Sequence, residues 1–185
     1  IHQDFGFSIL NQRPVADDIR RYFPATFEMV TIAIVLATAL AVPLGVISAV
    51  KKDRWGDHLS RLVAIAGISL PLFWLGLLLQ IVFAHYLHWT PLHGIVSMGV
   101  TLDNPVESVT GFLLIDTLIT GNWPVFFDHL HHLILPVITL AYPSVALIAR
   151  MTRSSMLEVM NLEYISAAIA NGVPRRRVIW LHALP

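Results

Sequence analysis

Cysteine is absent from the 185-residue chain, and charged residues make up only 13% of it. Without cysteine the chain can form neither a disulfide nor a thiolate metal site, so thiol chemistry gives no information about its compartment. Soluble domains usually contain about 25% charged residues, so a content of 13% beside 56% hydrophobic residues favours a membrane protein. The formal net charge is zero, which argues against a nucleic-acid binder that acts through bulk positive charge.

Motifs for chemistry are missing as well. The sequence contains no G-x-x-x-x-G-K-[ST] phosphate loop, so energy from ATP would have to come from another polypeptide. It also shows no arrangement of nucleophile and base, and we predict no catalytic residue and no cofactor. The chain opens at Ile1 without a signal segment and closes at Pro185 directly after a predicted helix, so we expect both ends to be cuts through a longer protein.

Three stretches lack formal charges for long enough to cross a bilayer, which takes about 20 helical residues. They are 29–50, 62–84 and the stretch between Asp128 and Arg150, whose apolar part is 133–149. Each contains proline, which a membrane helix bundle tolerates because neighbouring helices satisfy the freed carbonyl groups. Glycines at three positions in the first two stretches predict close helix approach. These are Gly45, Gly67 and Gly76. The prolines could serve packing alone or shape a pathway, and the sequence leaves both open.

Lysine and arginine predict the orientation of these spans. They are concentrated in residues 51–61 and 150–177 and absent from 88–129, so the positive-inside rule places the first two segments in the cytoplasm. Residues 1–24 are then expected outside, although Arg13, Arg20 and Arg21 in this segment do not follow the rule. The predicted organisation is an external lead (1–24), a span (25–50), a cytoplasmic loop (51–61), a span (62–87), an external loop (88–129), a span (130–150) and a cytoplasmic coupling region (151–185).

The external loop has two further features. Residues 111–119 are mostly apolar, with Asp116 among them, and are too short to span a membrane. They predict a short helix that lies at the membrane surface or caps the outer mouth, with Trp89 and Trp123 as interfacial anchors. Six histidines also gather on the predicted outer side. Imidazoles could bind nickel, copper or zinc, but no carboxylate pair or cysteine completes a ligand set. We therefore predict no metal site and expect these histidines to stay neutral and to hydrogen-bond to water or headgroups. The six are His85, His88, His93, His129, His131 and His132.

Glu28 and Gln80 are the polar side chains nearest to the spans or within them. Polar groups in membranes are often functional, so both are candidate pathway residues. Glu28 could instead simply face water at the outer end of its span, where its charge also suits the helix dipole.

Residues 154–185 are typical of two helices joined by a break. We predict a helix over 157–171, a left-handed cap at Gly172, Pro174 in the first position of the next helix, and that helix over 175–184. Such a corner could enter a groove in a partner, or it could be an ordinary loop whose arginines set topology. The residues themselves do not decide between these interpretations.

This segment resembles the E-A-A-x3-G-x9-I-x-L-P cytoplasmic loop of ABC importer permeases. With Gly172 on the glycine position, serine replaces the motif glutamate and His182 replaces the isoleucine. The matched positions, which the resemblance assigns to coupling with an ATPase, are Ser166, Ala167, Ala168, Gly172, Leu184 and Pro185.

Nearly the whole chain resembles the B-type subunit of the dipeptide/oligopeptide/nickel permease branch. The similar stretches include PATFEM, PLGVISAVKK, GISLPLFWLGLLL, LILPVITLAYPSVALIARMTRSSMLEV and EYISAAIANGVPRRRVIWLHAL. The resemblance implies an all-α polytopic helix bundle of the type I importer kind in the bacterial inner membrane, of which this chain would contain the second, third and fourth of six spans.

The resemblance also implies partners and a function. The expected partners are a second permease subunit, two cytoplasmic ATPase subunits, a periplasmic or lipid-anchored binding protein and membrane lipids, with no nucleic acid. The expected function is import of di- or oligopeptides. Import of nickel or a metal chelate by the same machinery is one alternative, and an ion-coupled carrier or channel without an ATPase is another, although the three charge-free stretches offer no charge to bind a coupling ion.

Overall fold

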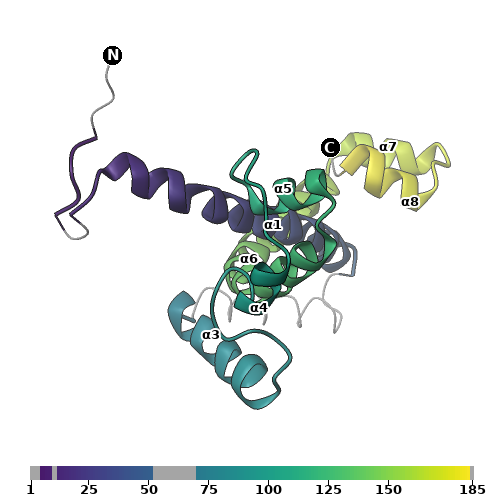
Figure 1. Cartoon of the computed structure of the whole chain (residues 1–185). Coiled ribbons are helices and arrows are strands. Elements are labelled where there is room, and N and C mark those ends of the chain that lie inside the picture. Colours follow the sequence, from purple (N-terminus) through teal and green to yellow (C-terminus); the bar gives the residue numbers. More distant parts are fainter. Residues whose placement is uncertain (1–4, 10–11, 52–69, 184–185) are drawn as a thin grey trace. The chain divides into compact units, whose positions relative to one another are not determined.

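The computed structural model describes residues 5–9, 12–51 and 70–183 (Figure 1). Apart from an isolated bridge between Phe7 and Pro14, these residues form no β-structure, which confirms the all-α prediction. The helices in chain order are α1 (Val15–Val50), α3 (Leu72–Leu79), η1 (Gln80–Tyr86), α4 (Met98–Asp103), α5 (Leu113–Thr120), α6 (Trp123–Val159), α7 (Glu163–Ala170), α8 (Arg175–Arg177) and η2 (Val178–Ala183).

Helices α1 and α6 are long and apolar enough to cross a bilayer. With 36 and 37 residues, each is about 55 Å long at ~1.5 Å per residue. Both extend beyond the predicted spans, since α1 begins at Val15 and α6 continues to Val159. The second predicted span is described only from residue 70 onward, where α3 and η1 form a shorter apolar helix over Leu72–Tyr86. Residues 62–69 lie outside the described part of the chain.

The helix of the second span changes its hydrogen bonding at Gln80. From there it continues as the π-helix η1, which ends near Leu87. The N–H of Leu87 donates to the carbonyl of Val82 (3.0 Å). The N–H of Trp89 then bonds to the Phe83 carbonyl (2.8 Å), and His88 between them has a positive φ of 53°. Wider turns of this kind are rare and usually local, and here the π-helix leads directly into the segment before α4.

The chain divides into two compact units, Ile1–Ile32 with Leu78–Val137 and Ala33–Leu77 with Ile138–Pro185. Helices α1 and α6 supply residues to both. The core of the second unit contains residues from α1, α6, α7 and η2. Its buried members are Val46, Ala49, Met156, Ile165, Val178 and Ala183.

Glycine allows close packing within the second unit, as predicted. A Cβ at Gly45 would lie 2.6 Å from Cβ of Thr152 and 2.8 Å from the carbonyl oxygen of Ala149, so α1 contacts α6 almost backbone to backbone there. At Gly76 the nearest atom is Cγ2 of Thr139, at 3.4 Å, which is ordinary contact. Gly67 lies outside the described residues.

Aromatic side chains contact one another in the first unit. Phe27 of α1 contacts Phe112, immediately before α5, with ring centroids 5.7 Å apart. Trp123 and Phe126, at the start of α6, pack edge to face at 5.8 Å. The helix predicted within residues 111–119 is confirmed as α5.

Candidate functional site

The segment that resembles the permease coupling loop starts with a break in the helix. Helix α6 ends at Val159 and α7 begins at Glu163, so the prediction of one helix over 157–171 is wrong. The side chain of Asn161 donates to the Leu157 carbonyl (2.8 Å), and Leu162 is extended at φ −77° and ψ 149°. An asparagine side chain competes with the backbone for such bonds, which explains why the helix stops there.

Gly172 forms the corner after α7. Its φ is +79°, and its N–H donates to the Ile169 carbonyl (3.0 Å), while the N–H of Val173 donates to the Ala168 carbonyl (3.1 Å). This pair of bonds is a Schellman motif, so the predicted left-handed cap is confirmed. A Cβ at Gly172 would meet nothing within 4 Å. The backbone conformation, rather than lack of space, therefore selects glycine at this position.

The second helix of the corner follows immediately. Pro174 precedes it as the N-cap, so its prediction as the first helical residue is wrong by one position. The Pro174 carbonyl accepts hydrogen bonds from the N–H groups of Arg177 (2.8 Å) and Val178 (3.1 Å). Helix α8 then passes into the π-helix η2, which confirms a helix in this place up to Ala183. Figure 1 shows α7 and α8 in yellow as two short helices.

The exposed face of α7 contains part of the predicted coupling set. Ser166, Ala167 and Gly172 are exposed, whereas Ala168 is half-buried against the core that includes Ile165. Leu184 and Pro185 lie outside the described residues. The small side chains surround Ile169, which is 54% exposed. Sequence reasoning missed Ile169, although helical spacing would have found it, because Ile165 and Ala168 are three apart and turn inward together.

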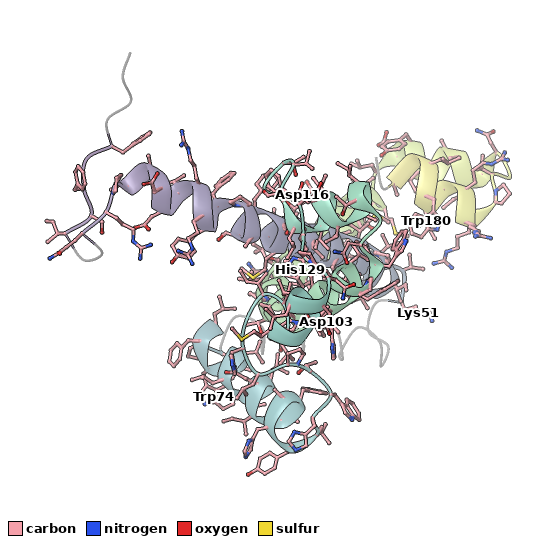
Figure 2. All side chains as sticks on the ribbon, in the orientation of Figure 1. Lys51, Trp74, Asp103, Asp116, His129 and Trp180 are labelled. Carbon is pink, nitrogen blue, oxygen red and sulfur yellow. The ribbon has the colours of Figure 1, made fainter. Side chains whose placement is uncertain are left out.

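A second group of polar side chains lies in the first unit. Glu28 of α1 is 7% exposed and His129 of α6 is 1% exposed. The Glu28 carboxylate accepts the Leu114 N–H of α5 (2.9 Å) through Oε1, and Oε2 lies 3.2 Å from His129 Nε2. His129 Nδ1 is 2.8 Å from the Ile95 carbonyl oxygen. Figure 2 labels His129 among the surrounding side chains.

The partners of His129 limit where its protons lie. Because the Ile95 carbonyl can only accept, Nδ1 carries a hydrogen, and the bond at Nε2 then requires a proton on His129 or on Glu28. Glu28 therefore does not simply face water. It ties α5 and α6 to α1 through contacts far apart in the sequence. Gln80 also has a partner, since its side chain donates to the Leu92 carbonyl. A pathway role for Glu28 or Gln80 stays a prediction.

The loop before α5 is fastened by Asp116, labelled in Figure 2. Its carboxylate accepts bonds from the Thr110 N–H (2.7 Å), the Thr110 hydroxyl (2.6 Å) and the Gly111 N–H (3.0 Å). Burial alone would raise the pKa of Asp116, but these hydrogen bonds outweigh burial and lower that pKa below its ordinary value. Asp116 is therefore an ionised acceptor that holds the loop against the start of α5.

Three of the six histidines that are predicted to lie on the outer side bond to the protein backbone, contrary to the expectation of water or headgroups as partners. His129 contacts the Ile95 carbonyl, His131 Nε2 lies 2.6 Å from the Trp89 carbonyl, and His132 Nδ1 lies 2.8 Å from the Asp128 carbonyl. Within the described ranges, no group of three or more histidine, aspartate or glutamate side chains is arranged to hold a metal ion.

Comparisons with known proteins agree with the resemblance. Residues 41–185 match the family described as binding-protein-dependent transport system inner membrane component. All of this chain aligns, at 46% identity, with 53% of a probable D,D-dipeptide transport system permease protein, DdpB, of Escherichia coli K12. It aligns equally fully, at 43% identity, with 54% of the dipeptide transport system permease protein DppB of the same strain.

A relative with a different printed function is the putrescine export system permease protein SapB of Escherichia coli K12, which is 35% identical over all of this chain and 57% of its own length. The chain thus spans about half the length of the curated relatives that it matches. The family match extends over most of the chain and includes α6 and the Gly172 corner. The chain belongs to the family of binding-protein-dependent transport system inner membrane components.

Proposed function

We propose that this chain is part of a permease subunit that imports di- or oligopeptides across the bacterial inner membrane, driven by separate ATPase subunits. The observation that carries the proposal is the identity of 46% and 43%, over the whole chain, to two permeases whose names specify dipeptide transport. The remaining partners in the proposal are a second permease subunit and an external substrate-binding protein.

The division into two units supports the proposed topology. The described residues expected outside the cell belong to the first unit, and residues 151–183, expected in the cytoplasm, belong to the second. The Gly172 corner would then be the cytoplasmic contact with the ATPase, because its exposed face of small side chains around Ile169 fits a groove in a partner. Closure of the ATPase shifts the permease only if this contact differs between the two states of the transporter.

Gly172 provides the test. A residue with a side chain pays about 1–2 kcal/mol in the left-handed region, and asparagine tolerates that region better than a β-branched residue does. We expect Gly172→Val to insert normally but to lose substrate-stimulated ATP hydrolysis, and Gly172→Asn to retain much of it. Gly121 is the matched control, since it ends α5 with a φ of +70° and nothing within 4 Å of its Cβ position. Gly121→Val carries the same backbone cost outside the proposed ATPase contact and should keep hydrolysis coupled.

Uptake into vesicles then decides the substrate and the energy source. Labelled dipeptide uptake should be reduced by unlabelled dipeptides and not by nickel. Putrescine is the second candidate substrate because of the export permease relative, and its accumulation in inverted vesicles would favour it. Normal dipeptide uptake by Gly172→Val would refute the coupling assignment. Uptake that persists in energised vesicles without ATP would favour an ion-coupled carrier.

A further inference from the structure

The helical segment after the Gly172 corner has one face that does not pack against the hydrophobic core of the second unit. Val178 and Ala183 are buried in the hydrophobic core of the second unit. Positions 176, 177, 180 and 181 follow an i, i+1, i+4, i+5 spacing that places them on another face. Together with Pro174 they line an open hollow of about 490 Å³. Trp180, labelled on this segment in Figure 2, is 43% exposed, and Leu181 is 61% exposed.

This face is strongly cationic. It presents Arg176 and Arg177, which are exposed, and the adjacent Arg175 is exposed as well. In the part of the chain that the structure describes, no carboxylate forms an ion pair with any of the three. Guanidinium groups bind phosphate oxygens in bidentate fashion and are less strongly hydrated than lysine, so they suit recognition of a phosphate ester. The face therefore combines unpaired phosphate-binding groups with an exposed indole and an exposed leucine.

We propose that this face, hereafter the Arg–Trp face (Pro174, Arg176, Arg177, Trp180, Leu181), binds the headgroup of an anionic phospholipid in the cytoplasmic leaflet. The assignment rests on the proposed function, because it requires residues 151–185 to be cytoplasmic. Basic side chains next to a membrane helix are attracted to the anionic leaflet. Tryptophan prefers the depth of the headgroups, and leucine reaches the acyl chains.

Charge and composition favour a lipid over an acidic groove of the ATPase. The α7 face proposed for the ATPase is made of small, uncharged side chains, whereas the Arg–Trp face is formed by α8 and η2 and presents cations beside large apolar groups. A lipid supplies both complements in one molecule, a phosphate and a hydrocarbon chain. A protein groove that pairs with the arginines is the competing outcome of the test.

Quenching of tryptophan fluorescence tests the proposal. The complete transporter is placed in nanodiscs that contain phosphatidylcholine and a minority of brominated phosphatidylglycerol. We expect more quenching by brominated phosphatidylglycerol than by the same amount of brominated phosphatidylcholine, and we expect Trp180→Phe to remove the excess. In Arg176→Gln/Arg177→Gln the apparent affinity for phosphatidylglycerol should fall at least about fivefold, since each basic side chain near an anionic surface contributes roughly that factor. The matched control, Arg20→Gln/Arg21→Gln, removes two exposed charges from α1 and should leave the excess unchanged.

The measurement is repeated after the ATPase has been stripped from the permease, so a failure of ATP coupling does not affect it. An excess of quenching that is unchanged in Arg176→Gln/Arg177→Gln would overturn the proposal. So would release of the ATPase by this variant with lipid binding intact, because that result assigns the arginines to the protein contact.

Discussion

The contact between α1 and α6 at Gly45 makes a prediction whose sign follows from distances. Alanine at this position would place its Cβ 2.6 Å from Thr152 Cβ, 2.9 Å from Thr152 Cγ2 and 2.8 Å from the Ala149 carbonyl oxygen. Real Cβ contacts are essentially never this short. The carbonyl belongs to the backbone of α6, so relief requires a shift of the helix rather than a change of rotamer.

Two opposing effects set the magnitude. Overpacking of a close interior costs about 1–3 kcal/mol, while replacing glycine by alanine inside a helix contributes about 0.5–1 kcal/mol in the other direction. At Gly45 the steric cost is larger, and we expect Gly45→Ala to lose about 1–2 kcal/mol of stability. At Gly76 the nearest atom is 3.4 Å away, so only the helix propensity changes and Gly76→Ala should be neutral or slightly stabilising.

Thermal unfolding of the purified transporter, followed by intrinsic fluorescence at matched lipid and protein concentrations, measures both variants. The expected result is a lower transition temperature for Gly45→Ala and an unchanged or higher one for Gly76→Ala. If Gly45→Ala melts at or above the wild-type temperature, α1 and α6 do not approach as closely as described, and the reasoning from these distances is wrong.

Two further predictions concern the first unit. Glu28→Ala removes one partner of a buried pair and should destabilise by about 3 kcal/mol in thermal unfolding, whereas Glu28→Leu/His129→Leu should lose less because neither side chain of the pair is left buried without its partner. If the stability lost in the double variant equals the sum of the losses in Glu28→Leu alone and His129→Leu alone, this reasoning is contradicted. Asp116 has a lowered pKa, so its stabilising effect is present above the ordinary value of 3.8 and is lost as pH falls through the folded-state pKa. Hydrogen exchange at the Thr110 amide should therefore be faster in Asp116→Asn than in the wild type at pH near 6, and the difference should shrink as the pH falls below 3.8 through the folded-state pKa. A difference that stays constant down to the acid unfolding of the protein would refute the role of the ionised carboxylate.

Local signals in the sequence were sufficient to predict the Gly172 corner and the two long helices α1 and α6. Gly172 was predicted to be left-handed from its place between a helix former and Pro174, and φ is +79°. This prediction succeeds because a helix cap depends on a few adjacent residues. The break at 160–162 was missed, since it depends on whether Asn161 bonds to its own helix or to solvent, and the residue type allows either.

By itself, the sequence determined that the chain is apolar and helical, that residues 88–129 contain no lysine or arginine, and that the chain resembles a permease. These features could be predicted because composition, helix length and motif spacing depend on residues that are neighbours along the chain. Only the tertiary structure decided that Glu28 is buried against His129, 101 residues away, and that Ala168 turns inward while Ile169 stays exposed. Such pairings depend on which helix faces meet, and many sequences with the same local pattern would bring different side chains together.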